Sequence, residues 1–415
     1  MTIIGTSLII GLAIWYAWRY SKTSIDPDWA MFNLGGFTGA LYGRDFVDCK
    51  SPLIHLWYAG LTAIVGKDIS KVRFLHHTLV SLPGIALFNY TGSIALGLGF
   101  VVLINSGFLL AFHGNVGQIP AGMIALAIAS GEPIISAIAL VLAVAFEPKL
   151  IISVLIMAIF YNCLIPFSAI VGIGILLFIA LWFLWRDMAD WLIYQNITIP
   201  KRMTEARKKM IKEHPERIWT WSSAIGMAYF LPIALLAIYQ RPVMEYWLPA
   251  LAYIAIMILG LVLRQNHLIP LIGWIVMAGV PDIYWIGLVI IDLTASGFYL
   301  TNAWYIFYQA LLTQNSDAKA IGLWLKDKKG DVWVNGIHSG VYIYAEKAPI
   351  GGMCEQIEIR EVAHERREQW RKHIKHNAPQ YVVMSNLPGW KFEPRSGYRK
   401  IANTEMGSAI YEKAA

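Results

Sequence analysis

The sequence predicts a polytopic α-helical membrane protein with a small α/β domain after its last apolar run. Two observations carry this prediction. The chain has 415 residues, of which 57% are hydrophobic and only 15% charged, with a mean hydropathy of +0.52. Apolar runs also recur from residue 3 to about residue 313, each near the length that crosses a hydrocarbon core of roughly 30 Å. Backbone amides cannot stay unpaired in lipid, so we expect these runs to be helices.

We expect about 11 to 13 spans, and several runs are short enough to be half-spans or helices lying at the interface. The predicted helices cover residues 3–18, 52–66, 73–90, 93–112, 118–130, 133–146, 149–162, 166–186, 218–239, 246–263, 267–280 and 282–313. The first run leads into "WYAWRYSK" and not into a small-residue cleavage site, so we expect it to remain as an anchor.

The texture of the sequence changes at Thr313, which divides it into two predicted domains. Residues 1–313 form the transmembrane domain, including an external loop over 19–51, and residues 314–415 have ordinary soluble composition. In this tail "DVWV", "GVYIYAEK", "PQYVVMS" and "SAIYEKA" are typical of strands, and "EVAHERREQWRKHIKH" is typical of an amphipathic helix. A small α/β domain fits this order.

The net charge of +7 does not indicate a nucleic-acid partner, because the basic residues concentrate in residues 186–217 and in the tail, where acidic residues are interspersed. Such segments usually flank membranes and meet lipid phosphates. If residues 187–217 are external, helix 52–66 lies in the interface and about 11 spans remain; if they are cytoplasmic, about 13 spans result. The three cysteines show no metal-site spacing.

The loop after the first helix concentrates charge beside the membrane. Asp26, Asp28, Asp45 and Asp48 precede Lys50 within one short stretch. One interpretation is a solvated turn, since Asp-Pro-Asp is good turn chemistry. The functional interpretation is that a carboxylate takes a proton from an acceptor while a cation neutralises a phosphate leaving group. That chemistry needs both signs of charge in one cavity.

The stretch "DPDWAMFNLGGFTGALYGRDFVDCKSPLIHLW", followed by "IVGKDISKVRFLHHTLVSL", resembles the first external loop of GT-C glycosyltransferases. The resemblance is to the dolichyl-phosphate-mannose protein mannosyltransferase-like family, which includes the bacterial aminoarabinose transferases. The tail, with "YIY", "RREQW", "PQYVVM", "YRKI" and "IYEK" in that order, is similar to the small external domain of many members. The matching positions are Asp28 (with Asp26 as its rival), Gly39, Tyr42, Asp45, Asp48, Lys50, Pro52, Leu53, Gly66 and Arg73.

The resemblance implies a general base and a donor-phosphate ligand. Asp28 is the implied base, since aromatic Phe32 follows it by four residues as in the family, and Asp26 is the alternative. Lys50 matches the lysine of the family's K-P-P-L motif, which contacts the donor phosphate; its alternative role is a snorkelling interfacial lysine. The further residues implied to contact substrate are Phe32, Tyr42, Asp48, His55 and Gln118.

Three positions depart from the family pattern. Ser51 replaces the first proline of K-P-P, and Met31 stands where aminoarabinose transferases carry an arginine. Replacement phosphate ligands are Arg44 in the same loop and Lys201 or Arg202 in "NITIPKRM", although the last two also suit a positive-inside loop. Gln118, with His113 and Asn115, occupies an expected break between helices where many relatives carry an acid; satisfying a helix end is the alternative role.

The expected function is transfer of a sugar from a polyprenyl-phosphate donor to an external protein, lipid or glycan acceptor, in the plasma membrane, with the tail outside. No cofactor is required, and a divalent metal on Asp26, Asp28 and Asp48 is an option. The alternatives are a catalytically idle GT-C scaffold subunit, a ligase that moves a whole glycan, and a transporter. Asp282 and Asp292 are intramembrane acids of the kind that carry function, whereas His76 and His77 are better suited to packing than to metal binding.

Overall fold

The structure is a computed structural model, and it describes most of the chain. The described residues are 2–22, 27–42, 45–47, 50–105, 115–213, 244–259, 269–275, 281–298, 317–335, 340–350, 352–353, 376, 378–384, 397–404 and 407–414. The chain divides into two compact units. The first, which we call the helical unit, comprises Met1–Lys22, Ile69–Ala180 and Thr204–Ala303. The second, the mixed unit, comprises Thr23–Asp68, Leu181–Met203 and Trp304–Ala415.

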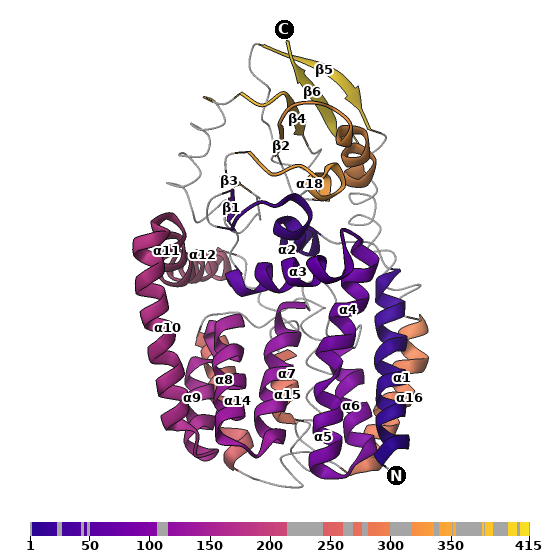
Figure 1. Ribbon diagram of the computed structural model, residues 1–415, viewed down its shortest axis with the longest axis vertical. Coiled ribbons are helices and arrows are strands. Elements are labelled where there is room, and N and C mark those ends of the chain that lie inside the picture. The colour runs from indigo at the N-terminus through magenta and orange to yellow at the C-terminus, as the bar shows by residue number, and fades with distance from the viewer. Residues whose placement is uncertain are drawn as a thin grey trace. The chain divides into compact units, whose positions relative to one another are not determined.

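The helical unit is a bundle in which α1, α4, α6 and α16 lie side by side (Figure 1). Its helices are α1 (Thr2–Ser21), α4 (Ile69–Ser81), α5 (Pro83–Thr91), α6 (Ile94–Asn105), α7 (Asn115–Ser130), α8 (Pro133–Phe146), α9 (Ile151–Phe160), most of α10 (Leu164–Leu184), α14 (Met244–Leu259), α15 (Ile272–Ile275) and α16 (Asp282–Phe298). A short 3-10 turn, Pro148–Leu150, precedes α9. Glu147 and Lys149 form an ion pair at 3.4 Å within this turn between helices.

Two helices of the described chain, α1 and α10, are long and apolar enough to cross a membrane by length and composition. Six shorter apolar helices accompany them within the same described residues. The helix predicted over 73–90 is wrong as a single helix: it is divided into α4 and α5 at Pro83, which has no backbone N–H to continue the ladder. The helix predicted over 218–239 lies outside the described residues.

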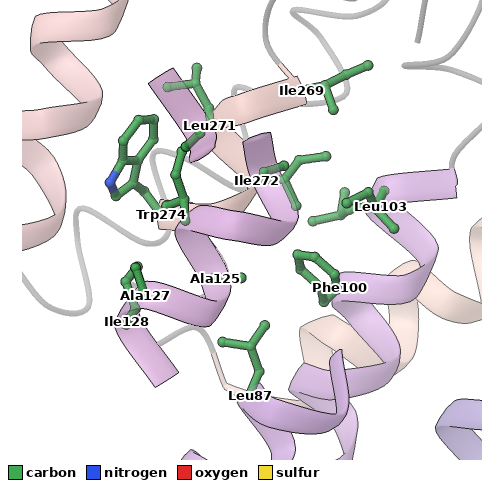
Figure 2. Packing of buried hydrophobic residues seen from close by; sticks show 14 of the residues in the cluster. Leu87, Phe100, Leu103, Ala125, Ala127, Ile128, Ile269, Leu271, Ile272 and Trp274 are labelled. Carbon is green, nitrogen blue, oxygen red and sulfur yellow. The ribbon is translucent and has the colours of Figure 1, made fainter. Parts of the chain in front are cut away.

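The core of the helical unit is apolar and draws on ten of its helices and on the segment before α15. Figure 2 shows Leu87, Phe100 and Leu103 facing Ala125 and the segment of Ile269, Leu271, Ile272 and Trp274. Gly273 permits a close approach of α15 to α7, because a Cβ there would stand 2.7 Å from Ile124 Cγ2 and 2.8 Å from the Ala121 carbonyl oxygen. In lipid, such packing contacts between small residues hold helices together.

The mixed unit joins segments from the beginning, middle and end of the chain. It contains α2 (Pro27–Thr38), β1 (Phe46–Val47), α3 (Pro52–Val65), α11 (Arg186–Ile193), a π-helical turn (Tyr194–Thr198), the start of α12 (Ile199–Glu213), a helix over 317–326, β2 (Val332–Asn335), α18 (Gly340–Ala345), β3 (Gly352–Met353), β4 (Tyr381–Met384), β5 (Tyr398–Asn403) and β6 (Ala409–Lys413). The main sheet has the order β2-β4-β6-β5; β2 and β4 are parallel and the other pairs antiparallel. β1 and β3 form a separate parallel pair, Phe46 opposite Gly352.

One tail segment differs from its prediction. The strands predicted at "DVWV", "PQYVVMS" and "SAIYEKA" are confirmed as β2, β4 and β6, whereas "GVYIYA" is the helix α18 and not a strand. Val341, Tyr342 and Ile343 are buried in succession, and a helix buries consecutive residues when neighbours cover it on several sides. The tight neighbour is helix 317–326, where a Cβ on Gly322 would lie 2.5 Å from Tyr344 Cβ. The predicted helix "EVAHERREQWRKHIKH" lies outside the described residues apart from His376.

Candidate functional site

The predicted external loop, residues 19–51, contains α2 and leads into α3, and the two helices pack together as a hairpin. α3 begins at Pro52, with the Oγ atom of Ser51 accepting the Leu53 N–H at 3.3 Å, and it ends at Gly66, whose φ of 81° favours glycine. α2 crosses α3 at Gly36, because a Cβ on Gly36 would stand 2.6 Å from Thr62 Oγ1. The part of this loop over 27–38 is therefore a helix packed against α3 and not a turn, while the surroundings of the Asp26 and Asp28 side chains lie outside the described residues.

Asp28 occupies the first turn of α2, one helical turn before the buried Phe32. Its side chain falls outside the described part of the structure, as do Asp26, Arg44 and Asp48. The predicted roles of these four residues, and a divalent metal on the aspartates, stay predictions. Among the described residues no group of three or more potential metal ligands occurs.

Three of the residues implied to contact substrate meet in one buried aromatic cluster around His55. The His55 ring stacks on Tyr42 with centroids 4.8 Å apart, and it meets Phe46 at 5.1 Å and Phe32 at 5.9 Å edge to face. The Tyr58 ring stacks on the Phe32 ring, with the two centroids 5.8 Å apart. All five side chains are buried, so the cluster belongs to the interior of the mixed unit. Direct substrate contact by Phe32, Tyr42 and His55 stays a prediction.

The hydroxyl of Tyr42 connects this cluster to two other segments. It donates a hydrogen bond to the Lys50 carbonyl oxygen at 3.2 Å and accepts one from Trp191 Nε1 at 3.0 Å. Trp191 lies on α11 and is 2% exposed. Sequence reasoning missed Trp191, because its segment has the composition of a charged membrane-flanking loop; a tryptophan between charged residues was the available signal.

The two cations at the start of α12 have different surroundings. Arg202 is half-buried; its Nη1 atom donates to the Tyr194 hydroxyl at 3.2 Å, and its guanidinium lies 5.9 Å from that ring's centre. Lys201 is exposed. Tyr194 in turn lies 5.6 Å from the Trp191 ring. Tyr42, Trp191 and Tyr194 thus connect the Lys50 backbone to the Arg202 side chain. The predicted contact of the two cations with phosphate stays a prediction.

Gln118 belongs to the helical unit and lies within α7, so its predicted place in a break between helices is wrong. The side chain is buried; Nε2 donates to the Ile104 carbonyl oxygen at 2.7 Å, and Oε1 lies 3.0 Å from His76 Nε2. Gln118 therefore satisfies the end of α6, the alternative role that the sequence allowed. Its contact with donor stays a prediction.

Other polar residues of the helical unit are paired inside the bundle. His77 stacks on Tyr20 at 4.4 Å, and its Nδ1 lies 2.9 Å from Asn105 Oδ1. The buried carboxylate of Asp292 accepts a hydrogen bond from the Tyr16 hydroxyl, so α16 is fixed to α1. Asp282 is exposed and accepts from Ser93 Oγ at 2.6 Å. His76 and His77 thus have the packing role that the sequence favoured.

The comparisons with known proteins add one finding. No protein-family model and no curated protein matches this sequence. Among solved structures, the chain is similar to that of ArnT from Cupriavidus metallidurans bound to undecaprenyl phosphate, with a TM-score of 0.53 and 13% sequence identity. The match covers 99% of this chain and 98% of that chain. The likeness is one of fold, and at that level it agrees with the resemblance predicted from the first loop and the tail. The number of spans stays a prediction.

Proposed function

We propose, starting from the GT-C fold that this chain shares with ArnT, that it is a membrane glycosyltransferase that uses a polyprenyl-phosphate-linked sugar donor. The observation that carries the proposal is the likeness over 99% of the chain to a protein whose structure holds undecaprenyl phosphate. A charged loop that lies between two apolar segments of the sequence supports it, because such a donor needs lipid around its tail and polar partners around its phosphate.

In the proposed reaction an acceptor hydroxyl or amine attacks the anomeric carbon of the donor sugar. The bond between that carbon and the phosphate oxygen breaks with inversion, and polyprenyl phosphate leaves with the electron pair. Asp28, with Asp26 as its alternative, takes the acceptor's proton. Lys50 stabilises the leaving phosphate, together with Arg202 or with Arg44 or Lys201. The nucleotide was removed when the donor was made, so no nucleotide site is needed.

The proposed location is the plasma membrane, with the C-terminal domain and the acceptor on the external face. The purified full-length chain, supplied with a polyprenyl-phosphate-sugar extract and candidate acceptors, tests the reaction. The decisive comparison sets Asp28→Asn and Asp26→Asn against the unsubstituted protein, with sugar transfer and undecaprenyl phosphate binding measured separately. We expect Asp28→Asn to abolish transfer and to leave phosphate binding in place.

Asp327→Asn and Lys329→Ala are matched controls, because both residues are exposed on the loop that follows helix 317–326. Lys50→Ala should weaken binding of undecaprenyl phosphate, and Lys329→Ala should not. Transfer that persists in both aspartate variants would refute a base in this loop. A folded protein that binds undecaprenyl phosphate and never transfers sugar would instead identify the idle GT-C scaffold.

A further inference from the structure

We propose that Trp191 is a positioning residue that holds Lys50 and Arg202 in place through an aromatic bridge. The aromatic bridge consists of Tyr42, Trp191 and Tyr194. This inference rests on the proposed function, because it concerns how the two cations are presented to the donor phosphate. It assigns roles to Trp191 and Tyr194, which the family pattern in the sequence did not single out, and it gives Tyr42 a task other than touching substrate.

One end of the aromatic bridge holds the backbone of Lys50. A lysine ammonium sits on a flexible four-carbon stem, so its position depends on how well its backbone is fixed. The Tyr42 hydroxyl donates to the Lys50 carbonyl oxygen at 3.2 Å and so holds that backbone. The Tyr42 ring is itself 8% exposed and stacked on His55, and this packing holds the hydroxyl that makes the hydrogen bond in place.

Trp191 is the middle residue of the aromatic bridge and contacts Tyr42 through its indole N–H. An indole N–H can only donate, and it donates to the Tyr42 oxygen at 3.0 Å. This bond leaves the Tyr42 proton for the Lys50 carbonyl, because the hydroxyl cannot donate back to Trp191. Trp191 is 2% exposed on α11, so the bond is made within the protein and not in competition with water. The indole thus sets the direction of the Tyr42 hydroxyl.

The other end of the aromatic bridge contacts the side chain of Arg202. Tyr194 lies 5.6 Å from Trp191, and its hydroxyl accepts from Arg202 Nη1 at 3.2 Å. α11 passes into α12 through the π-helical turn Tyr194–Thr198, a distortion that is frequent at functional sites. One buried tryptophan therefore supports a cation of the first loop and a cation of the segment that follows α11, about 150 residues later in the chain.

The test measures binding of undecaprenyl phosphate to the full-length protein. Tyr42→Phe removes one hydroxyl, and Trp191→Phe keeps an aromatic ring but removes the N–H. Each change should weaken binding by roughly two- to tenfold, the range expected for one hydrogen bond. The variant with both Tyr42→Phe and Trp191→Phe should bind about as well as whichever single variant binds less tightly, because the two groups act in series. Tyr194→Phe should weaken binding through Arg202 alone, and so should add to Tyr42→Phe.

Two further measurements separate positioning from structural damage. In a Lys50→Ala background, Trp191→Phe should weaken binding of undecaprenyl phosphate less than it does in the unsubstituted protein. A general loss of folding would instead weaken binding equally in both backgrounds. Tyr284→Phe, at a hydroxyl that is exposed on α16, is the control and should bind as the unsubstituted protein does. With transfer assayed, the bridge variants should raise KM for the donor more than they lower kcat.

Two results would overturn the inference, and they are distinguishable. If the unsubstituted protein binds undecaprenyl phosphate and Tyr42→Phe binds equally well, the bridge does not position Lys50, while the proposed function stands. If the folded, unsubstituted protein does not bind undecaprenyl phosphate at all, the proposed function fails and the inference fails with it.

Discussion

Ser51 shows how a single residue can depart from the motif that the first loop resembles and keep the local structure. It stands at the position of the first proline in the K-P-P pattern, and its Oγ atom caps α3 by accepting the Leu53 N–H. Pro52 then occupies the first position of the helix, where a missing N–H costs nothing. The helix that follows Lys50 therefore begins at a defined residue despite the substitution.

Replacing this cap should destabilise the protein. Ser51→Ala removes the oxygen that satisfies a free N–H at the start of α3, so we expect a loss of about 1 kcal/mol in the free energy of unfolding. Thermal unfolding in detergent is the measurement. Ser51→Asp keeps a capping oxygen and is the control; if Ser51→Ala unfolds at the same temperature as the unsubstituted protein, the cap contributes nothing.

At the scale of elements, the crossing of α2 and α3 depends on the absence of a side chain. A Cβ on Gly36 would approach Thr62 Oγ1 to 2.6 Å, closer than real Cβ atoms come, and the Ala59 Cα atom to 3.2 Å, which is tighter than most Cβ contacts. Gly60, on α3, is the opposite case, since nothing lies within 4 Å of a Cβ built there. The two glycines thus form a matched pair within one hairpin.

The same substitution should have opposite effects at the two sites. Gly36→Ala must force the helices apart and should cost about 1–3 kcal/mol of stability. Gly60→Ala meets open space and should gain about 0.5–1 kcal/mol from the better helix propensity of alanine. Chemical or thermal unfolding of both variants decides this; a destabilised Gly60→Ala with an unaffected Gly36→Ala would contradict the described crossing.

The same hairpin shows what the sequence could and could not predict. α3 was predictable within a residue, because a continuous apolar run lies between a Ser-Pro start and Gly66. α2 was not, because Gly35 and Gly36 weaken helix propensity, and the contact with α3 that calls for glycine at position 36 is visible only in the fold. Likewise, the cluster of Phe32, Tyr42 and His55 rests on residues that the family pattern marks, whereas Trp191 joins it from a distant segment.

At the scale of the whole molecule, the mixed unit is tied together by charge as well as by packing. Glu346, just after α18, accepts a hydrogen bond from Lys326 and lies 3.6 Å from Lys67, which follows α3. The hydrogen bond from Lys326 lowers the pKa of Glu346 below its ordinary value of 4.5. The carboxylate therefore links the hairpin segment with two parts of the tail while it is ionised.

This link should weaken in acid. A carboxyl group whose pKa is lower in the folded state contributes its full stability above pH 4.5 and loses it as the pH falls through the folded value. The contribution is small, because the groups are largely exposed. Unfolding temperatures of the unsubstituted protein and Glu346→Gln should differ at neutral pH and converge in acid. A gap that is independent of pH would show that charge is not the cause.

The pairing of β1 with β3 has a consequence for biosynthesis. Phe46 emerges from the ribosome some three hundred residues before its neighbour Gly352 is made. The hairpin that carries Asp28 and the stretch that carries Lys50 are therefore made well before this neighbour, and the helices of the helical unit that follow α1 are translated in between. A nascent chain that is released early would keep every one of those helices and still lack the strand that closes its first loop.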